Sequence, residues 1–125
     1  MLKHIFSDLT CHGIDSVDET SLAANVSGQV LEICQKKASA VQNNVKFDLV
    51  IVSDTLIQDP DVVSLAMGKA SDAIEAAAML HRLSGRRHRV WSATGIFYQN
   101  SWEFHLNQAI VEFDEISDKD LVELV

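Results

Sequence analysis

The fold class is decided by residues 27–55, which read SGQVLEICQKKASAVQNNVKFDLVIVSDT. In the first part, one stripe of side chains recurs every three or four positions, and this spacing predicts an amphipathic helix over about residues 27–42. The stripe consists of Val30, Ile33, Cys34, Lys37, Ala38 and Val41. After Asn43-Asn44, residues 47–52 form an almost continuous apolar run rich in β-branched side chains, typical of a strand buried on both faces. A helix followed directly by a strand predicts an α/β fold.

A second helix is predicted from Asp72 to about Ser84. Asp72 can accept a hydrogen bond as the N-cap, and Glu75 stands three positions later, where a capping box has its acidic residue. Gly85 follows at the position where many helices end in the left-handed conformation. Both ends of this helix are therefore marked by the sequence.

The last part of the chain predicts an antiparallel hairpin and a short helix. Apolar and polar side chains alternate from residue 88 to residue 113, and Gln99-Asn100-Ser101 is typical of a tight turn between two strands. A short helix is expected over residues 117–124. We therefore expect one α/β domain over residues 1–125, with a mixed central sheet flanked by helices.

Composition limits the classes of function. The chain has 125 residues, 47% of them hydrophobic, and a formal net charge of −8. This charge has the wrong sign for neutralising the phosphates of a nucleic acid polymer. No run approaches the ~18 apolar residues of a membrane span, and the first residues lack the apolar region of a signal peptide. Cys11 and Cys34 form neither a CxxC pair nor a disulfide framework, so we expect a cytoplasmic protein. From the charge and the hydrophobic pattern, we expect neither a nucleic acid polymer nor a membrane as a partner.

Asp54 and Lys37 are the first candidate site residues. Asp54 directly follows the predicted strand, where a carboxylate could bind Mg²⁺ or hold a water as a general base. The alternative is an aspartate that only initiates a turn. Lys37 lies in the apolar stripe of the helix, where an unpaired ammonium group is costly and needs an anion. Its alternative is a side chain at the edge of the stripe that extends its charge into water.

Three further candidates are weaker. Lys69, in the Gly68-Lys69 pair before the second helix, could present its ammonium group to phosphate oxygens, or belong to an ordinary loop. Glu19, in Val17-Asp18-Glu19, could join Asp54 around one cation, or be solvated charge. The basic residues 86–89 could attract an anionic ligand, or form a solvated turn. On a protein of this charge, a phosphorylated ligand would need a local pocket and a divalent cation.

Taken in order along the chain, these segments resemble the Maf family. Residues 68–90 are similar to its signature GKPxDxxEAxxMLxxLSGxxHxV, with Ala70 in place of the proline. Ser53-Asp54-Thr55 resembles the ADT element of the family, and residues 17–19 resemble its VDE element. Together with Lys37-Ala38, the resemblance covers about residues 14–124.

The resemblance implies a Maf/ITPase-like fold and a nucleoside triphosphate pyrophosphatase. Such an enzyme hydrolyses a nucleoside triphosphate to the monophosphate and pyrophosphate with a divalent metal, for which Mg²⁺ is expected and Mn²⁺ is the alternative. By position, Asp54 would be catalytic and would bind the metal with Glu19. Lys37 and Lys69 would bind the phosphates of the substrate.

The chain also departs from the family pattern at both ends. The family begins with a strand and an SxSPRR loop and continues into a GAYxIQG-like motif, and neither segment is found here. The expected domain is therefore a Maf-like domain shortened at both ends. A sheet that lacks its first strand exposes an edge, which a homodimer could cover. The alternative to an enzyme is a non-catalytic Maf-like remnant that acts as a nucleotide-binding or protein-interaction module.

Overall fold

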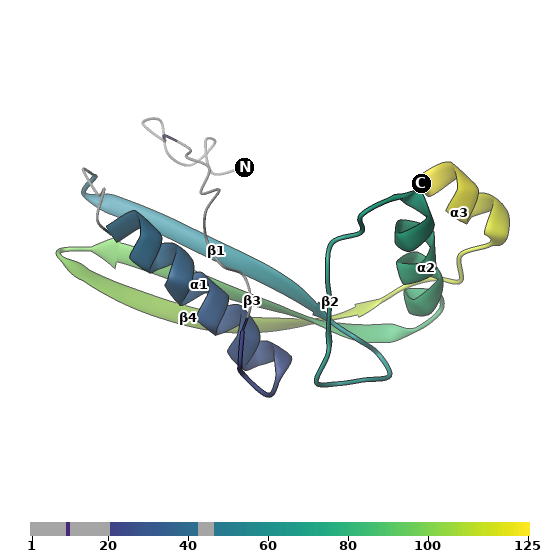
Figure 1. Cartoon of the computed structure of the whole chain (residues 1–125), viewed down its shortest axis with the longest axis horizontal. Coiled ribbons are helices and arrows are strands. Elements are labelled where there is room, and N and C mark those ends of the chain that lie inside the picture. Colours follow the sequence, from purple (N-terminus) through teal and green to yellow (C-terminus); the bar gives the residue numbers. More distant parts are fainter. Residues whose placement is uncertain (1–9, 11–20, 43–46) are drawn as a thin grey trace.

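The computed structural model describes residues 10, 21–42 and 47–125, and it shows an α/β fold (Figure 1). One helix, α1, lies along one face of three long strands, and two shorter helices lie together beyond one end of these strands. The four described strands form one sheet in the order β2-β1-β3-β4. The elements are α1 (Val26–Gln42), β1 (Leu49–Gln58), β2 (Ala66–Met67), α2 (Ala73–Leu83), β3 (Arg87–Tyr98), β4 (Ser101–Glu112) and α3 (Asp118–Leu124).

The described sheet is antiparallel throughout, whereas a mixed sheet was predicted. The pairs β1–β2, β1–β3 and β3–β4 all run in opposite directions. The reason is the path of the chain between β1 and β3. The connection through β2 and α2 stays at the end of the sheet where β1 finishes, so β3 starts there and runs back. A parallel neighbour would need a connection that returns along the whole sheet.

Strand β1 is longer and less buried than predicted. Its pairing with β3 extends from Leu49, opposite Tyr98, to Ile57, opposite Val90. Polar residues do not end β1, because the backbone of β3 offers hydrogen bonds along its whole length. The prediction of burial on both faces was wrong, since the side chain of Ile51 is 37% exposed on the face away from α1. Asp54 therefore lies in mid-strand, not after the strand end.

The core lies between α1 and the sheet. The predicted helix stripe is confirmed, because three of its members pack against two sheet residues in one buried cluster. This packing removes apolar area from water, which stabilises an amphipathic helix far more than its intrinsic propensity does. The cluster consists of Val30, Cys34, Ala38, Val52 and Ala93.

The predicted hairpin and its turn are also confirmed. β3 and β4 pair over their whole length, from Arg87 opposite Glu112 to Tyr98 opposite Ser101. Gln99 and Asn100 connect them with φ angles of 51° and 63°, as a two-residue turn of type I′ requires. The positive angle at Asn100 suits a residue type that tolerates the left-handed conformation.

The ends of α2 follow the predicted signals. The Asp72 carboxylate accepts a hydrogen bond of 2.7 Å from the backbone N–H of Glu75, as a helix N-cap does. Gly85 adopts a φ angle of 64° just after the helix. The last helix, α3, begins one residue later than predicted, with Ser117 as its N-cap. No helix in the described part of the chain is long and apolar enough to cross a membrane.

Gly95 sits where two strands and an aromatic ring come close. A Cβ atom at this position would lie 2.7 Å from Cε1 of Phe104 and 3.0 Å from Cγ2 of Val52. The Phe104 ring stacks on Trp102, so it has little room to move. We expect Gly95→Ala to lower the free energy of unfolding by about 1–3 kcal/mol, measured by denaturant unfolding.

Gly68→Ala is the matched control, because nothing lies within 4 Å of a Cβ atom there. This variant should unfold at the same denaturant concentration as the native protein or slightly above it. Equal stability of the two variants would show that the contact of Gly95 with Phe104 does not constrain the sheet.

Candidate functional site

Lys37 and Asp54 form an ion pair across the interface of α1 and β1. Nζ of Lys37 lies 2.8 Å from Oδ1 of Asp54, and the two side chains are 20% and 15% exposed. Lys37 points inward because it belongs to the helix stripe, and Asp54 faces α1 because it lies two residues after the buried Val52, on the same face of β1. The anion required by the position of Lys37 is thus the Asp54 carboxylate, and its ammonium group does not simply extend into water.

The second carboxylate oxygen of Asp54 faces no donor. Oδ2 is buried and has no hydrogen-bond partner among the described residues. The strand neighbour opposite is Ala93, which has no polar side chain and is 0% exposed. A carboxylate oxygen with unused lone pairs is a ligand that a hard cation such as Mg²⁺ accepts. Asp54 therefore fits a divalent metal, although its oxygen is only one of the ligands that such an ion needs.

Other metal ligands are not grouped around it. Over residues 21–42 and 47–125, no three His, Cys, Asp or Glu side chains are placed to hold one ion. Mg²⁺ in phosphoryl-transfer sites is commonly held by one or two carboxylates, by water and by the phosphates of the substrate. Asp54 suits such a site better than a metal cage made of protein ligands alone. Glu19, the second predicted ligand, lies outside the described residues.

Cys34 lies directly beneath the pair. Its thiol is completely buried, with Sγ 3.9 Å from the backbone oxygen of Val52. Burial, together with the negative charge of Asp54, raises the pKa of this thiol above its ordinary value. A thiol that stays protonated is a poor nucleophile and a poor metal ligand. Cys34 therefore contributes packing to this site.

Lys69 lies on the exposed segment between β2 and α2. Ile57 of β1 is opposite Met67, the last residue of β2, so the chain has left the sheet before Gly68 and Lys69. Residues 68–70 are exposed and follow β2 toward α2. The structure thus brings Lys37 and Asp54 into contact, and it places Lys69 outside this contact, on the exposed segment between β2 and α2.

Two of the basic residues 86–89 form ion pairs. Arg86 donates hydrogen bonds of 3.1 and 2.6 Å to the carboxylate of Asp61. Arg87 lies 3.4 Å from Glu112, its neighbour across the hairpin. These contacts support the alternative interpretation of the cluster as an exposed turn, because two of its three guanidinium groups already have acidic partners.

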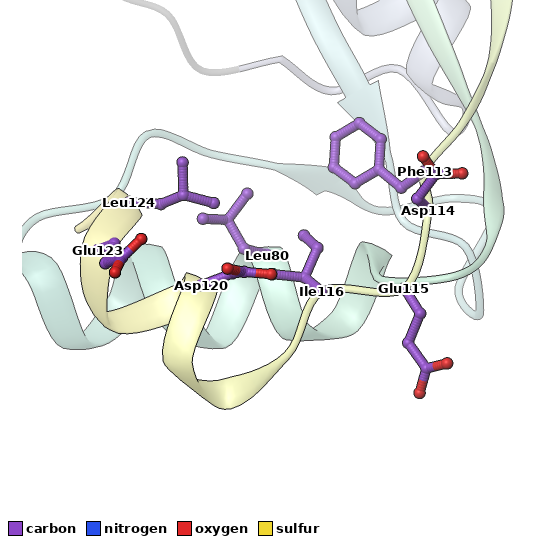
Figure 2. Close-up of a pocket in the computed structure, with 8 residues that line it drawn as sticks. All are labelled: Leu80, Phe113, Asp114, Glu115, Ile116, Asp120, Glu123 and Leu124. Atoms are coloured by element: carbon purple, nitrogen blue, oxygen red, sulfur yellow. The ribbon is translucent and has the colours of Figure 1, made fainter.

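A groove lies between α2 and α3. Figure 2 shows Leu80, Ile116 and Leu124 directed into it from both sides. The residues that line it are Leu80, Phe113, Asp114, Glu115, Ile116, Asp120, Glu123 and Leu124. Its charged lining residues are all acidic, so it repels the phosphates of a nucleotide. Lys37 and Asp54 remain the better candidate.

Comparison with known proteins identifies the family of the chain. The family model for Maf-like protein matches residues 1–125. The chain belongs to the Maf family. The resemblance predicted from the motif series is therefore confirmed, and the antiparallel sheet with its covering helix is the described part of a Maf-like fold.

Three curated relatives share the name dTTP/UTP pyrophosphatase. A Pyrococcus abyssi protein named dTTP/UTP pyrophosphatase is 31% identical over 108 residues, covering 86% of this chain and 55% of the relative. A Nitrosomonas europaea protein of the same name is 32% identical over 108 residues, covering 84% of this chain and 52% of the relative. A Bacillus cereus (strain AH820) relative, also of this name, is 29% identical over 109 residues, with 86% and 56% covered. The chain spans about half the length of these relatives.

In this Maf-family chain, the second half of the signature motif holds the turn before the hairpin. The Ser84 hydroxyl accepts a hydrogen bond of 2.6 Å from the backbone N–H of Ile116. The ring of His88 is buried against Phe113, with ring centres 5.0 Å apart, and burial lowers the pKa of His88. These contacts join α2 and β3 to the segment after β4, so their role is structural.

Sequence reasoning missed a second buried charge in the Maf-like fold. Asp59 is 3% exposed, and its carboxylate receives Nε and Nη2 of Arg82 at 2.8 and 2.9 Å. The backbone N–H groups of Asp61 and Val62 also donate to it. The ion pair fastens the end of β1 to α2, and Lys69 lies on the segment between these two elements. The Asp59-Pro60-Asp61 sequence signals a turn, but nothing local identifies Arg82 as the partner.

Asp59 predicts a dependence of stability on pH. Its hydrogen bonds with Arg82 lower its pKa from 3.8 to about 2. Because the folded pKa is below the unfolded one, the carboxylate stabilises the fold above about pH 4, and this contribution disappears as the pH falls toward 2. We expect the native protein to lose on the order of 2 kcal/mol from this group between pH 5 and pH 2.

The measurement is urea unfolding across this pH range for the native protein and for Asp59→Asn. The variant should be less stable at pH 7 and lose less stability on acidification. The control is Asp48→Asn at an exposed position, which should follow the native curve. Parallel curves for Asp59→Asn and the native protein would contradict the assignment.

Proposed function

We propose that this Maf-family chain carries the catalytic part of a nucleoside triphosphate pyrophosphatase. The observation that carries the proposal is the contact of a phosphate-binding residue type, Lys37, with a carboxylate whose second oxygen is unused, Asp54. A charged pair this poorly exposed is costly to keep unless it has a use. The names of the curated relatives support the same reaction.

The proposed reaction places each residue in a simple role. Water forms a new P–O bond, the anhydride bond between the α and β phosphates breaks, and the products are a monophosphate, pyrophosphate and a proton released to solvent. Asp54 would hold the water and the metal through its carboxylate, while Lys37 and Lys69 would bind phosphate oxygens. Mg²⁺ would supply positive charge against the phosphates, with Mn²⁺ as the alternative. Positioning and charge neutralisation are the main contributions to catalysis of phosphoryl transfer.

The proposal extends to the substrate, a second metal ligand and the location of the protein. dTTP and UTP are the first substrates to test, because the relatives bear these names. Glu19 is proposed as a second metal ligand on the family resemblance alone. A cytoplasmic location remains a prediction from the sequence.

We also propose that a second copy of the chain covers the β4 edge. β4 has one strand partner among the described elements and exposes Leu106 at 42% and Ile110 at 64%. An exposed edge strand with apolar side chains favours association.

The test is pyrophosphate release by the purified chain with Mg²⁺, over dTTP, UTP and the other nucleoside triphosphates, beside the Asp54→Asn variant. Turnover that depends on Asp54 would support the enzyme. A folded protein that binds nucleotide without turnover would instead support the non-catalytic nucleotide-binding module.

A further inference from the structure

We propose that the Lys37–Asp54 pair makes this site accept a divalent cation and a polyphosphate only as one complex, and hardly at all when either is alone. The proposal rests on the proposed function and adds the form in which the ligand is recognised. In the structure Nζ of Lys37 lies 2.8 Å from Oδ1 of Asp54, so the two charges neutralise each other. The ammonium group lies where a cation would approach Asp54, and the carboxylate lies where a phosphate would approach Lys37.

A cation alone meets two obstacles. It would have to bind Asp54 while the ammonium group of Lys37 stays 2.8 Å from the same carboxylate, and like charges repel strongly at poorly exposed positions. Oδ2 has no hydrogen-bond partner, but it is buried, and the described residues supply no group of three ligands around it. An ion that keeps most of its waters gains little from one carboxylate already neutralised by a lysine.

A polyphosphate alone meets the opposite obstacle. To reach Lys37, its oxygens must approach the Asp54 carboxylate, and this side chain is only 15% exposed, so water screens the repulsion poorly. Lys37 would also have to leave a carboxylate that forms no other ion pair with the described residues. Removing one member of such a pair leaves an uncompensated charge.

The two ligands together remove both obstacles. When phosphate oxygens replace Asp54 as the partner of Lys37, Asp54 gains a cation in place of the ammonium group. Each charge in the site then keeps an opposite charge beside it. The favourable coupling is reciprocal: the polyphosphate must raise the affinity for the cation by the same factor as the cation raises the affinity for the polyphosphate.

The test measures binding without turnover. Binding of Mn²⁺ is measured by electron paramagnetic resonance, alone and with the α,β-methylene analogue of dTTP. The methylene bridge between the α and β phosphorus atoms of this analogue cannot be hydrolysed. The analogue is titrated by calorimetry, with Mg²⁺ and with EDTA. We expect each ligand to bind at least about tenfold more weakly without the other, which corresponds to a coupling of at least about 1.4 kcal/mol.

The Lys37→Met variant tests whether the Lys37–Asp54 pair causes the coupling between cation binding and polyphosphate binding. Without the ammonium group, Mn²⁺ alone should bind more tightly than to the native protein, and the coupling should shrink to about threefold or less. Lys36→Met is the matched control, because Lys36 lies on the same helix and its ion pair is with Glu32, 3.9 Å away on α1 itself. This variant should keep the native coupling.

The outcomes separate the two proposals. Tight binding of Mn²⁺ alone to the native protein, or unchanged Mn²⁺ binding in Lys37→Met, overturns the inference and leaves the proposed function intact. A folded protein that binds the analogue under no condition overturns both. If Lys37→Met does not fold, the coupling measured in the native protein decides, because independent binding there already contradicts the inference.

Discussion

Pyrophosphate release by Asp54→Asn is expected to fall about 10³-fold below that of the native chain, while the variant stays folded. Asparagine keeps the shape of the side chain, and its amide oxygen can still accept a hydrogen bond from Lys37. It cannot supply the negative charge that a divalent cation needs or take part in ordering water as a base. The loss should therefore appear in kcat, measured as pyrophosphate released at saturating dTTP or UTP with Mg²⁺.

The control for this variant is Asp48→Asn. Asp48 is exposed and precedes β1, so its variant removes one negative charge from the same region without touching the pair. It should keep native turnover. Circular dichroism and thermal unfolding of both variants show whether they are folded. Native turnover in a folded Asp54→Asn would contradict a catalytic role of the ion pair.

The pair itself shows how much a sequence can reveal about a site. Lys37 could be identified because a lysine in an apolar helix stripe violates the pattern around it, and the structure supplies the anion that the violation required. Asp54 could be identified as a polar residue after an apolar run. The contact between them could not be derived from local pattern, because it depends on how α1 crosses the sheet.

The errors in the predicted sheet have the same origin. Hydrophobic pattern marked the start of β1 but not its end, because pairing with β3 carries the strand through Ser53, Asp54 and Thr55 to Gln58. Strand direction depends on where the connection through α2 lies, which no local sequence encodes. The hairpin was predicted correctly because its turn is local, and Gln99 and Asn100 show the expected positive φ angles.

The Asp59–Arg82 pair marks the limit of such reasoning. Its residues are 23 positions apart, and both look like ordinary surface charges in the sequence. Only the structure shows that Asp59 is buried and that Arg82 reaches it from α2. The pair connects both ends of the segment that carries Lys69, so it restricts where this lysine can lie.

Lys69→Gln is therefore expected to raise KM for the nucleotide about 10- to 100-fold, with a smaller change in kcat. The family resemblance assigns Lys69 to the phosphates of the substrate, and a hydrogen bond from a charged donor to phosphate contributes about 1.5–3 kcal/mol. Glutamine keeps much of the length but loses the charge. Steady-state kinetics of pyrophosphate release measures both constants.

Lys119→Gln is the matched control, since Lys119 is an exposed lysine on α3, on the far side of α2 from the sheet. Both variants lower the net charge of the protein by the same amount, so any general electrostatic effect on an anionic substrate should be equal in the two. A rise in KM confined to Lys69→Gln would assign a local contact with phosphate. Equal changes would mean that Lys69 acts only through the overall charge of the protein, and the phosphate-binding role would then rest on Lys37 alone.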